Sequence, residues 1–159
     1  MMASLSHLQP GPAAAATPLP FNLDAEKALL GALMIENRLA EEIILQLRDE
    51  HFFEPLHGRI YAQIRKLIDQ NMVANPVTLK PLFERDAAML DLGGPIYLIR
   101  LTEDPTILVA ARDCARQIYD LALLRELVRV GSELVEDATD TTAEVAPLKQ
   151  IEAAEEALY

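Results

Sequence analysis

The feature that most limits the fold of this chain is a long stretch without helix breakers. From Thr106 to about Asp137 the sequence contains no proline, and its only glycine is Gly131. Proline breaks a helix and glycine weakens one, so the stretch predicts a single continuous helix. With a rise of about 1.5 Å per residue, this helix would be on the order of 45 Å long. A globule built by the rest of a 159-residue chain is smaller than that, so part of the helix is expected to project.

A second helical arm follows the first. The polar run from Asp137 to Thr142 predicts a turn, and apolar residues at helical spacing resume from about Ala143 to Tyr159. Pro147 leaves the start of this arm open, because proline can tilt or delay a helix. Together the two arms predict a long antiparallel helical hairpin over residues 105–159.

The first arm carries more apolar residues than one neighbouring helix can cover. One partner arm covers about a third of a helix circumference, so a second apolar surface is left over. Self-association as a dimer or larger oligomer would bury it; the alternative is that the second arm folds across both faces. The candidate dimer or partner interface consists of Leu123, Leu124, Leu127, Val128, Val130 and Leu134.

Residues 20–104 predict a globule of short helices. Hydrophobic residues make up 51% of the chain but aromatic residues only 5%, so alanine and leucine supply most of the apolar content and favour helices over strands. Asn22 or Asp24 can cap the first helix, which is expected to end at Asn37. The fold class is therefore all-α: a small globular bundle of short helices followed by the long antiparallel hairpin.

Prolines and glycines divide the rest of the globule. Pro55 suits the first turn of a helix, directly after an aromatic turn at Phe52 and Phe53. A later helix is predicted to begin at Thr78, because a start at Asn75 would place Pro81 in the helix interior at a cost of about 3 kcal/mol. Gly93-Gly94-Pro95 predicts a sharp turn with Pro95 at the start of the next helix.

The N-terminal residues 1–19 are rich in proline, alanine and serine and predict a disordered tail. They lack the basic start and apolar core of a signal peptide, and no run of about 18 apolar residues occurs in the chain. The single Cys114 fits a reducing compartment. We therefore expect a cytoplasmic protein without membrane contact.

The chain offers little chemistry for catalysis or for binding cofactors. None of its lysines follows a glycine, which argues against a phosphate-binding P-loop. His51 and His57 lack the spacing of two metal ligands on one helical face, and His57 is expected to pack beside Phe52. Adjacent carboxylates such as Glu41 and Glu42 point to different helix faces. We therefore predict no catalytic, cofactor-binding or metal-binding residue.

Charge also narrows the choice of partners. A formal net charge of −11 repels phosphate backbones, so this chain alone is a poor candidate for binding DNA non-specifically. The arginines of the long helix are expected mainly to form ion pairs with nearby Asp113, Asp120, Glu126 and Glu133, with an acidic partner as the alternative. These arginines are Arg112, Arg116, Arg125 and Arg129.

Short motifs occur along the chain in a characteristic order. They are Pro20-Phe21-Asn22-Leu23-Asp24-Ala25-Glu26 with Leu30-Gly31, Phe52-Phe53 with His57, Val77-Thr78-Leu79, Gly93-Gly94 with Tyr97-Leu98, and Ala154-Glu155-Glu156-Ala157-Leu158. Their order and spacing resemble the N-terminal domain of bacterial replicative DNA helicases of the DnaB family. The residues that carry this resemblance as structural positions are Asn22, Glu26, Gly31, Phe52, His57, Thr78, Gly93, Gly94 and Tyr97.

The resemblance implies a function in DNA replication. In such helicases this domain pairs through the hairpin, forms a collar on a hexameric motor and binds primase; a helicase loader is a further candidate partner. The motor, a RecA-like ATPase that uses ATP and Mg²⁺, would lie beyond Tyr159. DNA would then be contacted through the full-length hexamer rather than through this acidic domain.

Two other functions fit the same residues without the resemblance. One is a freestanding acidic all-helical module that binds or regulates a protein unrelated to replication. The other is a small enzyme that uses scattered carboxylates. Binding to primase would separate the first of these from a helicase domain.

Overall fold

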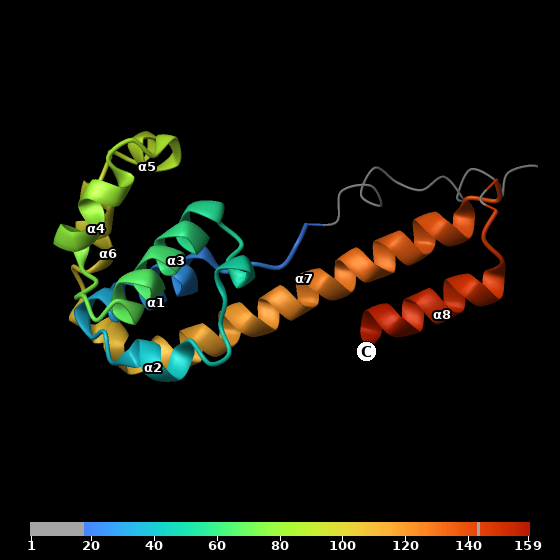
Figure 1. Ribbon diagram of the computed structural model, residues 1–159, viewed down its shortest axis with the longest axis horizontal. Coiled ribbons are helices and arrows are strands. Elements are labelled where there is room, and N and C mark those ends of the chain that lie inside the picture. The colour runs from blue at the N-terminus through green and yellow to red at the C-terminus, as the bar shows by residue number, and fades with distance from the viewer. Residues whose placement is uncertain (1–17, 143) are drawn as a thin grey trace, which may run out of the picture.

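The computed structural model describes residues 18–142 and 144–159, and every regular element in these ranges is helical. The predicted all-α fold is confirmed. Most of the predicted tail over residues 1–19 lies outside the described residues; only Pro18 and Leu19 fall within them. Figure 1 shows a cluster of short helices at one end, from which α7 projects with α8 beside its outer part. The elements are α1 (Leu23–Ile35), α2 (Leu39–Ile43), η3 (Asp49–His51), α3 (Pro55–Asp69), α4 (Pro76–Phe83), α5 (Ala87–Asp91), α6 (Ile96–Leu101), η4 (Pro105–Ala110), α7 (Ala111–Thr139) and α8 (Pro147–Leu158).

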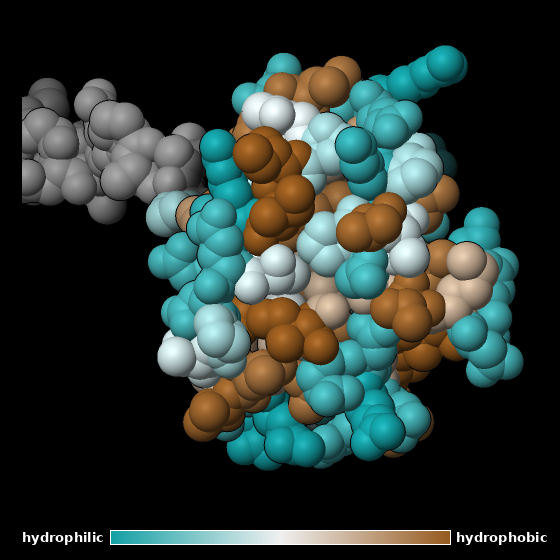
Figure 2. Space-filling view, turned by 90° about the vertical axis from the view of Figure 1, so that its left-hand side faces the viewer, coloured by the Kyte–Doolittle hydropathy of each residue, from teal (hydrophilic) through white to brown (hydrophobic). Residues whose placement is uncertain are grey.

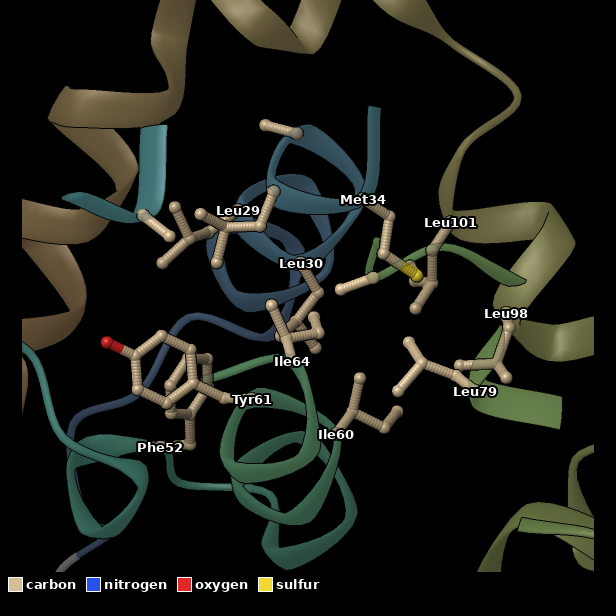
Figure 3. Packing of buried hydrophobic residues seen from close by; sticks show 14 of the residues in the cluster. Leu29, Leu30, Met34, Phe52, Ile60, Tyr61, Ile64, Leu79, Leu98 and Leu101 are labelled. Carbon is tan, nitrogen blue, oxygen red and sulfur yellow. The ribbon is translucent and has the colours of Figure 1, made fainter. Parts of the chain in front are cut away.

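Helix α1 is the centre of the globule. The Asn22 side chain caps it by accepting a hydrogen bond of 3.0 Å from the backbone N–H of Ala25. Leu29, Leu30 and Leu33 are completely shielded from solvent, and α3, α6 and α7 pack around the helix. Figure 3 shows side chains of α1, such as Leu29 and Leu30, facing Ile60 and Ile64 of α3.

Gly31 lets α1 and α6 approach closely. A Cβ atom built on Gly31 would lie 1.9 Å from the carbonyl oxygen of Leu101 and 2.7 Å from Cδ1 of Ile107. The first atom belongs to the backbone, so it cannot move aside without shifting α6. Glycine is therefore required by close packing at this position and not by its backbone angles.

Helix α4 begins earlier than predicted. It starts at Pro76, and Pro81 lies inside it, so the predicted start at Thr78 is wrong. Asn75 and Thr78 cap each other's backbone: the Asn75 side chain accepts from the N–H groups of Val77 and Thr78, and the Thr78 hydroxyl accepts from the N–H of Asn75. This capping box, together with Pro76 at the first helical position, outweighs the hydrogen bond lost at Pro81.

The glycine pair before α6 forms the predicted sharp turn. Gly93 and Gly94 have φ angles of +102° and +86°, a region that residues with a Cβ rarely adopt. The N–H of Gly94 also closes the end of α5 by bonding to the carbonyl oxygen of Met89 at 2.9 Å. The turn points α6 back onto the core, where Tyr97, Leu98 and Leu101 are buried.

A buried polar network joins α1, α3 and α6. The Glu26 carboxylate accepts hydrogen bonds from the backbone N–H groups of Phe53 at 2.7 Å and Glu54 at 3.2 Å, and from Nδ1 of His57 at 2.9 Å. Nε2 of His57 lies 2.6 Å from the Tyr97 hydroxyl. Burial raises the pKa of Tyr97 to about 12, so this hydroxyl keeps its proton at neutral pH and can donate it to Nε2. His57 therefore bonds to Glu26 and Tyr97, which the sequence-based prediction of packing beside Phe52 missed.

The long helix also differs from its prediction at one end. Residues Pro105–Ala110 form the short 3₁₀ helix η4, and α7 begins only at Ala111 and continues to Thr139. Asp104 caps η4 and Pro105 occupies its first position, which sets the chain into a tighter turn before α7 starts. Pro147 does not distort the second arm; it is the first residue of α8.

Replacing Glu26 with glutamine should destabilise the globule strongly. Both carboxylate oxygens accept N–H groups, so a glutamine NH₂ would face a donor wherever it pointed, leaving buried groups unpaired. We expect the free energy of unfolding in urea to fall by about 2–4 kcal/mol. Glu41→Gln on the exposed face of α2 is the control and should change it little. Equal stability of the two variants would contradict the network's role.

Two glycine-to-alanine variants should change stability in opposite directions. Gly31→Ala should lower the free energy of unfolding by about 1–3 kcal/mol, because its methyl group collides with the Leu101 carbonyl. Gly131→Ala should raise it by about 0.5–1 kcal/mol, because nothing lies within 4 Å of the added Cβ and alanine favours helix. Thermal or urea unfolding monitored by circular dichroism measures both. A stable Gly31→Ala variant would show that α6 can move away at little cost.

Candidate self-association surface on the helical hairpin

The two arms of the hairpin pack through small side chains. A shallow cavity between them is lined by Val130 and Leu134 of α7 and by three alanines of α8, Ala153, Ala154 and Ala157. Alanines allow the two helix backbones to approach closely, and Val130 becomes buried as a result, with 7% of its surface exposed. The antiparallel pairing of α7 and α8 confirms the predicted hairpin.

Most of the predicted interface residues remain uncovered. Leu123, Leu124, Leu127 and Leu134 are 42–52% exposed, and Val128 is half-buried. Val130 is the exception: it is buried beside α8 in the single chain, so its side chain is not offered to a partner there. Val135 is 63% exposed and adds to the apolar surface. Its spacing of eight residues from Leu127 was the signal that could have included it.

The second arm leaves apolar side chains of α7 exposed and exposes further apolar side chains of its own. On α8 and just before it, large apolar side chains are more than half exposed, so α8 does not fold across both apolar faces of α7. These residues are Val145, Leu148, Ile151 and Leu158. We use the name hairpin surface for the exposed apolar residues of both arms: Leu123, Leu124, Leu127, Leu134 and Val135 on α7, with the four residues of the second arm.

Arg129 and Arg112 of α7 form ion pairs. Arg129 forms ion pairs with Glu126 and, at 2.7 Å, with Glu133, as predicted for its helix. Arg112 pairs instead with Glu42 of α2 at 2.7 Å. All three pairs are largely exposed, so they contribute little to stability.

Arg125 departs from the expected ion pairing. Its Nη1 donates to the carbonyl oxygen of Pro20 at 2.9 Å and its Nη2 to that of His51 at 2.7 Å. The guanidinium also lies over the ring of Phe53, 5.5 Å from the centroid, and that ring stacks on Phe21. Burial lowers the pKa of Arg125, but an arginine side chain stays charged at any pH at which the protein is folded. Backbone carbonyls and an aromatic face thus take the place of a carboxylate.

The residues that carry the family resemblance lie in the globule. Glu26, His57 and Tyr97 form one network, Asn22 caps α1, and Phe52 is buried against the ring of Tyr61. The remaining four are placed elsewhere by caps, turns and close packing: Gly31, Thr78, Gly93 and Gly94. None of the nine belongs to the hairpin surface. The motif positions therefore shape the globule, and the interface positions form a separate set.

No helix among the described residues combines the length and the apolar character needed to cross a lipid bilayer.

Comparisons with known proteins agree on one family. Residues 18–120 match the family described as DnaB-like helicase N terminal domain. The chain is 40% identical over 141 residues to the replicative DNA helicase DnaB of Rickettsia prowazekii, and 28% identical over 117 residues to that of Mycobacterium leprae. These alignments cover 89% and 74% of this chain, but only 29% and 19% of the relatives. The chain thus spans less than a third of the length of the relatives it matches.

The fold has a counterpart among solved structures. The crystal structure of the N-terminal domain of DnaB helicase from Mycobacterium tuberculosis superposes with a TM-score of 0.78 at 27% sequence identity. The match covers 89% of this chain and 99% of that domain. A family match over most of the globule, close relatives and a shared fold lead to one conclusion: the chain belongs to the family of DnaB-like helicase N-terminal domains.

Proposed function

We propose that this chain is an assembly and docking domain of a replicative DNA helicase. The observation that carries the proposal is the hairpin surface, a set of large apolar side chains that are 42–73% exposed in the single chain. Its relatives are replicative helicases of more than three times its length. A domain of this family with an uncovered apolar hairpin is suited to holding helicase subunits together.

In the proposed assembly, the hairpin surface of one copy packs on that of a second copy. A two-fold symmetric contact brings the same patch from each copy together, so each leucine of the patch is buried in both copies. The exposed ion pairs of Arg129 with Glu126 and Glu133 would remain in solvent outside the contact. Three such dimers would make the collar of a hexamer in the full-length protein.

The globule would supply the docking function. We propose primase as its partner and a helicase loader as a second one. The globule also exposes apolar residues, among them Val77, Leu82 and Leu90. Figure 2, which views the globule end of the molecule, shows hydrophobic patches separated by hydrophilic side chains. Small mixed patches are typical of transient docking surfaces, whereas the hairpin surface suits a lasting contact.

DNA unwinding would belong to the rest of the protein. ATP and Mg²⁺ are the proposed cofactors of that motor, and the hexamer would contact DNA through it, since this domain carries a net charge of −11. A protein with this function would be located in the cytoplasm. The cheapest check is the coding sequence beyond Tyr159, where a Gly-Lys-Thr P-loop within about a hundred residues is expected for this family.

The double variant Leu124→Glu/Leu127→Glu should separate the hairpin dimer. It places two carboxylates per copy in a contact that is otherwise apolar, and the charges meet their own symmetry mates. Sedimentation velocity over a range of concentrations should show a dimer for the wild-type chain and a monomer for the variant. An unchanged mass would show that the surface is the wrong one, and a strictly monomeric wild type would contradict hairpin pairing.

A matched control uses two leucines of equal exposure in the globule. Leu82 and Leu90 are 50% and 53% exposed, close to the 47% and 52% of Leu124 and Leu127. Leu82→Glu/Leu90→Glu adds the same charge at the same exposure, away from the hairpin. This variant should remain dimeric, which would exclude a general effect of charge on association.

Primase binding decides between the helicase domain and a freestanding acidic regulator. Purified primase titrated into the chain in a calorimeter should give saturable binding, and ATP titrated alone should give none. Absence of primase binding under conditions where the chain is dimeric would favour the regulator. The Leu82→Glu/Leu90→Glu variant tests whether the globule is the docking face, because reduced primase binding with an intact dimer is expected there.

A further inference from the structure

The hydrogen bonds that the structure records between α7 and the globule end at Arg125. Ala111 and Ile118 of α7 are buried in the globule core, and Cys114 and Tyr119 pack against it. The outermost hydrogen bonds from α7 to the globule that the structure records come from Arg125. The next buried residue along the helix, Val130, is covered by α8. Arg125 therefore stands at the junction between the anchored and the projecting part of α7.

Three segments distant in sequence meet at this one side chain. Arg125 holds the segment before α1 through the Pro20 carbonyl and the turn before α3 through the His51 carbonyl. The stacked rings of Phe21 and Phe53, 4.3 Å apart at an interplanar angle of 8°, join the same two segments. We call this group, Pro20, Phe21, His51, Phe53 and Arg125, the clasp.

The clasp is built so that it can open without unfolding the core. Arg125, His51 and Phe53 are only partly buried and line an open groove between the globule and α7. The residues of the core cluster beneath, such as Phe52 and Ile118, are shielded almost completely. Loss of the clasp would therefore expose little apolar surface while removing the outermost attachment of α7.

A guanidinium is needed at this place. Its rigid planar fork donates to two carbonyl oxygens in different directions while one face lies on the Phe53 ring. An ammonium group is a point charge on a flexible stem and cannot satisfy these three contacts in one fixed geometry. The chemistry thus selects arginine over lysine, although both carry the same charge.

We propose that Arg125 sets the angle between the hairpin and the globule, and that this clasp restricts the geometries in which two hairpins can pair. The second half of the proposal rests on the hairpin dimer proposed above. The first half concerns a single chain and is independent of association.

The test measures the distance between the globule and the tip of the hairpin. Spin labels are placed on Arg85→Cys in the globule and Glu136→Cys near the end of α7, both exposed positions, in a Cys114→Ala background. Pulsed electron–electron double resonance on labelled chains, diluted with excess unlabelled chain, then reports distances within one copy. The doubly labelled chain that keeps Arg125 should give one narrow distance distribution. Arg125→Ala should broaden it at least two-fold, and Arg125→Lys should lie between the two.

Arg129→Ala is the matched control, because Arg129 lies one turn further along α7 and pairs only within that helix. Its distribution should stay as narrow as that of the parent chain. An equally narrow distribution for Arg125→Ala would overturn the proposal, and one for Arg125→Lys would overturn the need for a guanidinium. Should Arg125→Ala fail to fold, Phe53→Leu removes the aromatic face and keeps apolar bulk; it should broaden the distribution as well.

Sedimentation of the same samples separates the two proposals. A monomeric wild-type chain would contradict the hairpin dimer, yet the width of its distance distribution would still report on the clasp. A dimeric Arg125→Ala variant with a broad distribution is the result expected if both proposals hold. A dimer whose stability and distance distribution are both unaffected by Arg125→Ala would leave the dimer proposal standing and refute the clasp.

Discussion

The turn from His51 to Glu54 is the constraint on which the rest of the structure depends. From the inside, the Glu26 carboxylate accepts the N–H groups of Phe53 and Glu54. From the outside, the Arg125 guanidinium donates to the carbonyl of His51 and covers the Phe53 ring. A carboxylate thus binds N–H groups of this short segment, and a guanidinium binds one of its carbonyl oxygens. Because the two charges lie on α1 and α7, the turn also holds these helices in a defined relation to α3.

This arrangement explains why buried polar residues occur in a small helical core rich in alanine and leucine. Apolar packing alone tolerates small rotations of one helix against another, because leucine side chains fit several arrangements. Directional hydrogen bonds from Glu26 through His57 to Tyr97 remove that freedom for α1, α3 and α6. Among the described residues, every buried side-chain nitrogen or oxygen has a hydrogen-bond partner, so the core bears no cost of an unpaired group.

The sequence predicted the features that depend on local chemistry. The cap at Asn22, the start of α3 at Pro55, the turn at Gly93 and Gly94 and the length of the projecting helix follow from nearby residues.

The failures came from competition between local signals. At α4 the capping box of Asn75 and Thr78 prevailed over Pro81, and at η4 the cap at Asp104 delayed the long helix. The partners of His57 and Arg125 were beyond sequence reasoning, because their contacts span 31 to 105 residues of chain. The burial of Val130 likewise required knowing which face of α7 meets α8.

The projecting part of α7 acts as a lever. Between Arg125 and Thr139 the helix extends for about 21 Å, at about 1.5 Å per residue. A rotation of about 10° at the junction would then move the tip by roughly 4 Å, close to the width of a side chain. Displacements of that size change which leucines face each other across a symmetric contact. Small adjustments at the base of the arm are therefore magnified at its end, so the geometry of an assembly could be controlled far from the residues that form it.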